Sequence, residues 1–340
     1  MTIALVISLV IAFFTTLTVI PSLIRFLYAS GVVGLDLNKP KKPMLPSSGG
    51  IVVAIGVLAG LLAYVGIQTF VYRQESLNLL AVTASVLIAM LVGFFDDLNV
   101  KSKKVKTNEG YDIRIGFPRW FKPLLTLPAA VPLMVISVGE TTLSLPIIGD
   151  FNFGLLYPLL LVPIGIVGAS NMVNMLGGYN GIEAGMGLIY MLSLGLFSLM
   201  VLGVGSSVIF FISSAALLAF LKYNWYPARI LPGDSLTYLL GSLVASGVIV
   251  GNMEKIGIIV MAPFIIQGIL KFYSKYKLGQ YASDLGIVGR DGTMKSKYNR
   301  NIFSLTHLVM NFGKFKEWEI TMIMMVVQLG FGILPFLIMR

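Results

Sequence analysis

The stretch LVGFFDDL (Leu91–Leu98) decides how this chain folds, because an apolar run reaches two adjacent aspartates just where it would leave a membrane. A carboxylate buried in hydrocarbon is costly, and two neighbouring carboxylates also repel each other. Asp96 and Asp97 can both stay ionised at the water boundary, in a polar cavity or around a shared cation. The pair is therefore either the solvated end of a spanning helix or part of a functional site, and the rest of the chain has to decide.

The composition is that of a polytopic membrane protein. Of the 340 residues, 56% are hydrophobic and 12% are charged, whereas soluble domains carry about 25% charged residues. Cysteine is absent, which excludes disulfides, thiolate nucleophiles and Cys-ligated metals. The single histidine, His307, excludes a multi-histidine metal site.

Ten apolar runs are long enough to cross about 30 Å of hydrocarbon. They lie near residues 3–24, 50–70, 78–95, 122–138, 153–170, 184–203, 205–222, 235–251, 256–272 and 319–338. The sequence therefore predicts one all-α transmembrane domain over residues 1–340, with about ten helices. The Gly-Val-Gly-Ser-Ser between the sixth and seventh runs is a weak turn, so these two runs could be miscounted.

Basic residues mark alternate connections between the predicted spans. Arg73, Lys255 and Arg340 fall on one side, and the other 22 of the 25 Lys and Arg residues fall on the opposite side. By the positive-inside rule, the basic loops are cytoplasmic and both termini are outside. The predicted cytoplasmic loops cover about residues 25–49, 96–121, 171–183, 222–234 and 273–318.

Three smaller elements are predicted outside the spans. Residues 141–154 and 286–295 have the alternation or the Asp-Gly turn of a short β-hairpin. Residues 296–319 place apolar side chains near helical spacing among basic ones, which predicts an amphipathic helix at the cytoplasmic membrane interface.

Informative polar residues gather in the basic-side loops. GLDLNKPKKPMLPSSGG (Gly34–Gly50) offers Lys39 to phosphates, although basic loop residues also simply set topology. Lys122 opens the fourth span, where it could anchor the helix at the interface or return near the aspartates. NMVNMLGGYNGIEAG (Asn171–Gly185) combines amides, glycines and Glu183 in a turn whose N–H groups can approach a ligand.

The eighth span opens with another polar cluster, in FLKYNWYPARILPGDSLTYLLG (Phe220–Gly241). Asp234 or the serine after it could be a helix N-cap, but a cap does not explain Asn224 nearby. Mg²⁺ takes a few protein oxygens and leaves the rest of its shell to water and substrate phosphates, and lysines can balance phosphate charge. We therefore expect a Mg²⁺–diphosphate site on this face. No Walker-A or dinucleotide motif occurs, which argues against an ATP-driven pump.

The chain resembles the polyprenyl-phosphate N-acetylhexosamine-1-phosphate transferases, and within them the dolichyl-phosphate N-acetylglucosamine-phosphotransferase branch. The resemblance rests on GFFDDL, RWFKPLLTLPAA, NMVNMLGGYNGIEAG and NWYPARILPGDS, in this order. It implies a ten-helix enzyme of the cell membrane, of archaeal type, that transfers sugar phosphate from a UDP-sugar to dolichyl or polyprenyl phosphate and releases UMP. The implied partners are UDP-N-acetylglucosamine, the lipid phosphate and membrane lipid, without nucleic acid; a homodimer stays open.

The resemblance also implies roles for particular residues. By motif match, Asp234 and Asn174 hold Mg²⁺, with Mn²⁺ as the alternative, and Lys122 contacts the diphosphate. The acidic pair, Asp96 and Asp97, serves the lipid phosphate. Substrate contacts are implied for Lys39, Gly178, Asn180, Glu183, Asn224 and Leu231, with Gly178 and Asn180 at the uracil.

Two departures from the family pattern bear on the substrates. Leu231 stands where the family often has a uracil-stacking phenylalanine, so stacking on the base stays open. The stretch Lys275–Lys295 lacks the histidine cluster of the bacterial peptidoglycan branch, and His307 is expected to be a packed residue. N-acetylglucosamine is therefore the expected sugar, as in the first membrane step of glycoprotein-glycan assembly.

Other functions stay open at this point. One alternative is a transferase for another UDP-N-acetylhexosamine, and another is a lipid-phosphate transporter or flippase, which would carry midplane acidic residues in broken helices. A covalent route through an aspartate is a further alternative. Direct attack is favoured because a lipid phosphate is already an anionic nucleophile at neutral pH.

Overall fold

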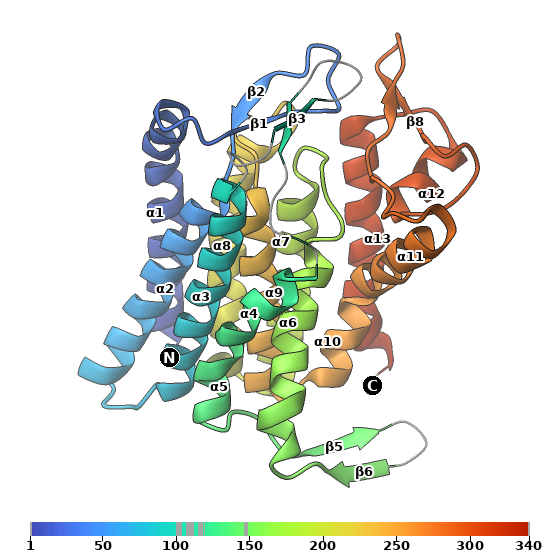
Figure 1. The fold of residues 1–340 in the computed structure, drawn as a ribbon. Coiled ribbons are helices and arrows are strands. Elements are labelled where there is room, and N and C mark those ends of the chain that lie inside the picture. Colours follow the sequence, from blue (N-terminus) through green and yellow to red (C-terminus); the bar gives the residue numbers. More distant parts are fainter. Residues whose placement is uncertain are drawn as a thin grey trace.

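The computed structural model describes residues 2–99, 104–106, 112–114, 118, 120–145 and 149–338. Its helices run up and down a bundle (Figure 1). The longer ones are α1 (Thr2–Ala29), α2 (Gly50–Phe70), α3 (Leu77–Asn99), α6 (Val162–Val173), α7 (Ile182–Val201), α8 (Val204–Asn224), α9 (Gly233–Val250), α11 (Ala262–Leu278) and α13 (Glu317–Ile338). The shorter ones are α4 (Lys122–Thr126), the 3₁₀ turn η1 (Leu127–Ala130), α5 (Val131–Val135), the π-helical turn η2 (Tyr157–Leu161), α10 (Glu254–Val260) and α12 (Leu305–Phe312).

The prediction of an all-α multi-pass bundle is confirmed, but the count of ten regular spans is wrong. Among the described residues, seven helices are long and apolar enough to cross a membrane, or eight if the bent pair α10–α11 is one span. The runs near 122–138 and 153–170 form helical segments of fewer than 18 residues. Prolines recur in both runs, among them Pro128 and Pro163, and interrupt the regular helix because they lack a backbone N–H.

The short strands form antiparallel pairs. Within the described ranges, β1 (Val33–Leu35) pairs with β2 (Met44–Pro46), β3 (Lys104–Lys106) with β4 (Asp112–Arg114), β5 (Thr142–Leu145) with β6 (Gly149–Asn152), and β8 (Thr293–Lys295) with both β7 (Ile287–Val288) and β9 (Phe315–Lys316). The β5–β6 and β7–β8 pairs confirm the two predicted hairpins. The β1–β2 hairpin was not predicted.

The amphipathic helix predicted over residues 296–319 is wrong in extent. The helical part, α12, covers only Leu305–Phe312. Ser304 caps its start, and Phe315 pairs with Met294 of β8 a few residues after its end, which stops the helix from continuing. Its location at a membrane interface stays a prediction.

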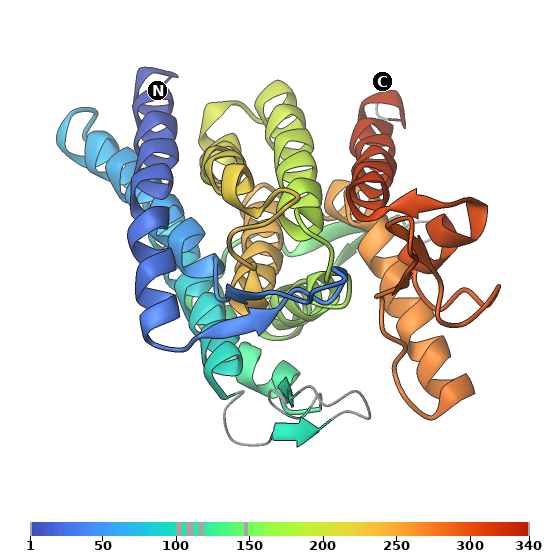
Figure 2. The same ribbon diagram turned by 90° about the horizontal axis from the view of Figure 1, so that it is seen from above.

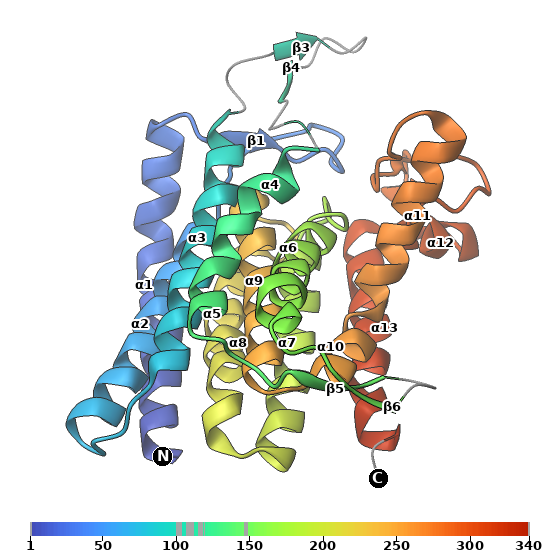
Figure 3. The same cartoon turned by 60° about the horizontal axis from the view of Figure 1, so that its bottom comes forward.

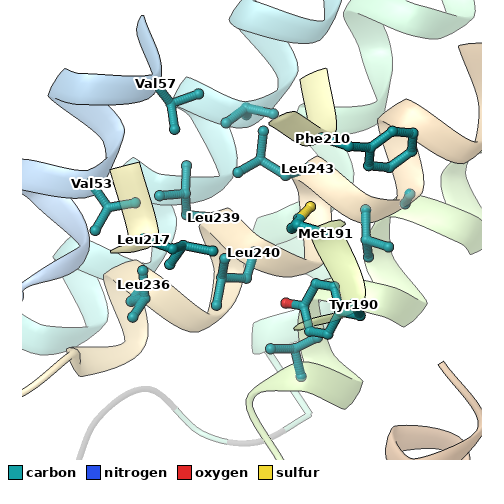
Figure 4. Close-up of a cluster of buried hydrophobic side chains, with 14 of the residues drawn as sticks. Val53, Val57, Tyr190, Met191, Phe210, Leu217, Leu236, Leu239, Leu240 and Leu243 are labelled. Carbon is teal, nitrogen blue, oxygen red and sulfur yellow. The ribbon is translucent and has the colours of Figure 1, made fainter. Parts of the chain in front are cut away.

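Helix α9 lies in the middle of the bundle and contacts α2, α3, α6, α7, α8 and α10. Figure 4 shows its leucines in the buried cluster between these helices: Leu236, Leu239, Leu240 and Leu243. Helix α3 approaches the first turn of α9 so closely that a Cβ on Gly93 would lie 2.3 Å from the Asp234 carbonyl oxygen. The packing of α3 therefore fixes the place where Asp234 stands.

The described parts of the predicted cytoplasmic loops gather at one end of the bundle, and both termini lie at the other end with the β5–β6 hairpin (Figures 1 and 3). Seen from the loop end in Figure 2, the β1–β2 hairpin lies across the middle of the bundle. The polar loops singled out in the sequence are thus brought to a common face.

The pair α10–α11 is bent by 63°. At the bend, the amide of Phe264 bonds to the Met261 carbonyl rather than to that of Val260, which a regular α-helix would use. The side chain of Gln328, from α13, donates to the Val260 carbonyl at 2.9 Å instead. A buried side chain of the last helix therefore supports the bend.

Candidate active site

Two cavities lie at the loop end of the bundle. The loop cavity, of about 370 Å³, is lined by the β1–β2 segment, the turn before α7, the start of α9 and the connection after α11. The lysine cavity, of about 950 Å³, is named for Lys122, Lys271 and Lys275 in its lining. The two cavities share a wall made of Asn174, Gly177, Gly178, Asp234, Asp284 and Leu285.

Asp97 of α3 caps the first turn of α9. Its Oδ1 accepts a hydrogen bond from the Asp234 amide at 2.8 Å, and its Oδ2 accepts one from the Ser235 amide at 3.1 Å. Amides at a buried helix start need acceptors, and a carboxylate there is also favoured by the helix dipole. Gly233 has a φ of +70°, and a Cβ on it would lie 2.4 Å from Asp97 Oδ2. The expectation that Asp234 or Ser235 caps its own helix is therefore wrong, because the cap comes from α3.

Lys122, the first residue of α4, pairs with carboxylates from two other helices. Its Nζ lies 2.5 Å from Asp96 Oδ2 and 2.8 Å from Asp234 Oδ2. The Asp96 side chain is 2% exposed, whereas those of Lys122 and Asp234 are 18% and 29% exposed. These three residues, called the Lys122 centre from here on, form a charged group with one side open to the lysine cavity.

Asn174 follows α6 and lines both cavities. Its Oδ1 accepts a hydrogen bond from Thr237 Oγ1 at 3.1 Å, and Thr237 lies one turn after Asp234 on α9. In the described part of the chain, no three acidic, histidine or cysteine side chains are grouped to hold a metal by themselves. One carboxylate and one amide oxygen at a polar cavity still fit Mg²⁺, which takes its remaining ligands from water and substrate phosphates.

The turn before α7 presents Gly178 to both cavities. Its amide donates to Glu183 Oε1 at 2.9 Å, and its carbonyl accepts from Asn38 Nδ2 at 2.7 Å. Glu183 lines the loop cavity, and its buried Oε2 has no hydrogen-bond partner among the described residues. Glu183 therefore holds the Gly178 amide through one carboxylate oxygen, and its other oxygen is buried beside the cavity.

Lys39 lies in a buried group behind the loop cavity. Its Nζ is 3.2 Å from Asp36 Oδ2 and 2.9 Å from Asn180 Oδ1, and it also contacts Glu317 Oε2. The ring of Tyr226 lies 4.4 Å from the same Nζ. We call Lys39, Asp36, Asn180 and Glu317 the Lys39 cluster. Asn180 and Asp36 line the loop cavity, whereas Lys39 lines neither cavity.

Leu231 and Asn224 have different locations. Leu231 lines the loop cavity, and its amide bonds to the Pro46 carbonyl at 2.7 Å. Asn224 is fully buried away from both cavities, and its Nδ2 donates to the Ile230 carbonyl at 2.9 Å. The structure therefore brings Leu231 to the site and leaves Asn224 supporting the connection between α8 and α9.

Sequence comparison agrees with the motifs at these positions. The model of the family described as glycosyl transferase family 4 matches residues 79–252, which contain the Lys122 centre and Asn174. A protein of Saccharolobus solfataricus, provisionally named UDP-N-acetylglucosamine–dolichyl-phosphate N-acetylglucosaminephosphotransferase, is 32% identical over 98% of this chain and 97% of its own. The chain belongs to glycosyl transferase family 4.

Two further relatives of this family 4 protein come from a eukaryote and a bacterium. The UDP-N-acetylglucosamine–dolichyl-phosphate N-acetylglucosaminephosphotransferase of Dictyostelium discoideum is 27% identical over 94% of this chain and 85% of its own. A Bacillus subtilis protein, provisionally named undecaprenyl-phosphate N-acetylglucosaminyl 1-phosphate transferase, is 28% identical over 81% and 71%. The resemblance inferred from the motifs is thereby confirmed.

A further ion pair of this family 4 protein was not predicted from the sequence. Lys271 Nζ lies 2.6 Å from Asp284 Oδ1, and Gln267 Nε2 donates to the same oxygen at 2.8 Å. Asp284 belongs to the wall shared by both cavities. The available signal was Asp284 as one of few acidic residues in a mostly basic loop.

His307 is fully buried, consistent with its expected packing role. Its Nε2 donates to the Ser283 carbonyl at 2.8 Å, since a carbonyl can only accept. Burial lowers the pKa of the His307 imidazole, which keeps the ring neutral at physiological pH.

Proposed function

We propose that this family 4 protein transfers N-acetylglucosamine-1-phosphate from UDP-N-acetylglucosamine to dolichyl or polyprenyl phosphate and releases UMP. The observation that carries the proposal is a series of adjoining cavities: the loop cavity and the lysine cavity share a wall at Asp234, and an apolar cavity adjoins the lysine cavity. These environments match a nucleotide, its diphosphate and an isoprenoid chain. The relatives named for this reaction align over most of the chain.

The apolar cavity suits the lipid acceptor. It has a volume of about 430 Å³ and is lined mainly by apolar residues of α6, α9 and the bent pair α10–α11. It shares Gly168 and Met172 with the lysine cavity. An isoprenoid chain bound there would extend its phosphate toward Lys122, because apolar and anionic parts of one molecule need adjoining apolar and cationic surfaces.

The loop cavity suits the nucleotide of the donor. We assign Gly178 and Asn180 to the uracil by motif, with Leu231 as an aliphatic contact in place of an aromatic one. The sugar would then lie at the shared wall, where the Asp284 carboxylate can accept hydrogen bonds from sugar hydroxyl groups. This assignment places the β-phosphorus between the two cavities.

The proposed reaction is a phosphoryl substitution. An oxygen of the lipid phosphate attacks the β-phosphorus of the UDP-sugar, the bond from that phosphorus to the bridging oxygen breaks, and UMP leaves with the oxygen. Such transfers depend on positioning and charge neutralisation. Lys122 would neutralise diphosphate charge, and Asp97 would hold α9 and with it Asp234. Asp96, which lines neither cavity, would hold Lys122 in place and act on the lipid phosphate through it.

We further propose that Asp234 and Asn174 hold Mg²⁺, with Mn²⁺ as the alternative. A bound divalent cation supplies charge neutralisation at the transferring phosphoryl group. The loop end is proposed to face the cytoplasm because the basic residues concentrate there. Both termini would then lie outside the cell membrane.

UMP release from the purified protein tests this function. We expect UMP and a lipid-linked sugar phosphate, seen by mass spectrometry, only when UDP-N-acetylglucosamine, polyprenyl phosphate and Mg²⁺ are all present. EDTA should stop the reaction, and added Mg²⁺ should restore it. Absence of UMP with every member of a UDP-N-acetylhexosamine panel would overturn the transferase, and activity unaffected by EDTA would overturn the metal assignment.

A further inference from the structure

The neighbours of Asn180 fix which end of its side-chain amide is the oxygen. Lys39 Nζ and the Ala228 backbone amide each lie 2.9 Å from Oδ1. An ammonium group and a backbone N–H can only donate, so both require an acceptor at this position. A flipped amide would direct its own N–H groups at two donors.

The opposite end of the amide is consequently the donor. Nδ2 carries two hydrogens, and Asp36 Oδ2 accepts one of them at 3.2 Å. The second hydrogen can serve a ligand, because Asn180 and Asp36 both line the loop cavity. The Asn180 side chain therefore has a donor of fixed identity at the lining of this cavity, with one hydrogen outside the contacts described above.

Carboxylates on either side hold Lys39 in place. The Lys39 side chain is 13% exposed and bonds to Asp36 and Glu317 as well as to Asn180. Glu317 Oε1 also accepts a hydrogen bond from the backbone N–H of Asn180 at 2.8 Å, and Thr321 Oγ1 donates to the backbone carbonyl of Asn180 at 3.1 Å. Lys39, Glu317 and Thr321, which do not line the cavity, thus fix both the backbone and the side chain of Asn180.

We propose that Lys39 is a positioning residue for base specificity: it holds the Asn180 amide with an N–H available to the loop cavity, which selects a base carbonyl over a base amino group. The inference rests on the proposed function, which puts a uridine nucleotide in this cavity. Uracil carries a carbonyl at the position where cytosine carries an amino group, and an amino group would meet the Asn180 donor without an acceptor. Lys39 then acts through Asn180 and does not contact phosphate.

Direct binding of uridine, UMP and CMP to the full-length protein tests this role. In Lys39→Met, we expect the affinities for uridine and for UMP to fall by the same factor, about tenfold, because the Asn180 side-chain amide is no longer fixed. The affinity for CMP should come within a few-fold of the affinity for UMP, since the Asn180 side-chain amide can now flip. Lys39→Arg keeps a cationic donor and should restore the preference for UMP. Lys41→Met, on an exposed lysine of the same loop, should change neither affinity nor preference.

Three outcomes would overturn the proposal. If Lys39→Met binds UMP more weakly but uridine with unchanged affinity, Lys39 is a phosphate ligand. If the preference for UMP over CMP is unchanged, Lys39 does not determine base specificity. If Lys41→Met loses the same affinity, the effect is not specific to Lys39.

If Lys39→Met does not fold, the double variant Lys39→Met/Glu317→Gln provides the same test. This double variant removes the ammonium together with one of its two buried carboxylates, so only the Asp36 carboxylate stays buried, and it keeps its hydrogen bond from Asn180 Nδ2. It should lose the preference for UMP to the same extent, because Asn180 Oδ1 has lost the same donor; retention of the full preference would overturn the proposal. Failure of the proposed function looks different, because the unmodified protein would then bind neither uridine nor UMP.

Discussion

The Lys122 centre and the Lys39 cluster have the same ingredients but different access. In each, one lysine bonds to two carboxylates. Lys122 lines a cavity of about 950 Å³, whereas Lys39 lines neither cavity and has an aromatic ring over it. A lysine at an open cavity can gain an anionic partner when a substrate enters, but an enclosed one cannot without moving the chain around it. Access therefore separates a charge that can act on substrate from a charge that holds the site together.

The largest effect should come from Asp234→Asn in the Lys122 centre. The change keeps the size of the side chain but removes the negative charge that meets Lys122 and, in the proposed function, the metal. We expect UMP release at saturating substrate to fall by more than about a thousandfold, in the range of a lost charge-stabilising group. Asp150→Asn on the exposed β6 strand is the control and should stay fully active. Activity within tenfold for Asp234→Asn would place the chemistry elsewhere.

Lys122→Met should be the next largest effect and should separate the two lysines. Loss of a cation at the transferring phosphoryl group should lower kcat for UMP release by about a hundredfold. The matched Lys39→Met should act mainly on KM for UDP-N-acetylglucosamine, because it disturbs nucleotide binding. Steady-state kinetics of both variants decide the matter. If kcat falls by the same factor in both variants, the Lys122 centre and the Lys39 cluster do not have different roles.

Gly93→Ala should disturb the Lys122 centre without changing any charge. The added Cβ would lie 2.3 Å from the Asp234 carbonyl oxygen, so α9 must move away from α3. We expect a loss of about 1–3 kcal/mol in the free energy of unfolding, as for other overpacked sites, and weaker activity. Thermal unfolding in detergent measures the first effect. Gly66→Ala in α2, where a Cβ meets nothing within 4 Å, is the control. Equal unfolding temperatures for the two variants would contradict the tight α3–α9 contact.

Gln328→Leu should have the smallest effect and should affect neither lysine directly. It removes the donor to the Val260 carbonyl at the α10–α11 bend. The loss should be about 1 kcal/mol of unfolding free energy, with a few-fold higher KM for polyprenyl phosphate and an unchanged KM for UDP-N-acetylglucosamine. Leu329→Met, on an exposed position of the same helix, should change none of these values. A change in the KM for UDP-N-acetylglucosamine instead would argue against a link between the bend and the apolar cavity.

Local sequence patterns predicted the helices and the common face, because apolar length and basic loops are properties of short segments. They did not predict the number of regular spans, since prolines such as Pro128 change the geometry within an apolar run. Nor did they separate Asp96 from Asp97. The two differ because Asp97 accepts hydrogen bonds from backbone amides in the first turn of α9. The nearest of these, the Asp234 amide, lies 137 residues later in the chain.

The location of Lys39 shows the same limit at the candidate site. In the sequence it belongs to a basic loop suited to phosphate, whereas its partner Glu317 lies 278 residues away. Contacts of this kind depend on tertiary packing, which spacing along the chain does not reveal. The shared motifs predicted the region of the candidate site, but only the packed helices distinguish residues that line a cavity from residues behind it.

The contact between Lys39 and Glu317 also has a consequence for biosynthesis. A ribosome adds about 5–20 residues per second, so the 278 residues between the two partners take about 14–56 s to make. During that time the amino-terminal helices can already occupy the membrane, but the group that fixes Asn180 lacks its last member. The Lys39 cluster, on the proposed nucleotide side of the site, is therefore completed only when Glu317 at the start of α13 has been made. We expect a partly made chain to bind a UDP-sugar more weakly than the finished protein does.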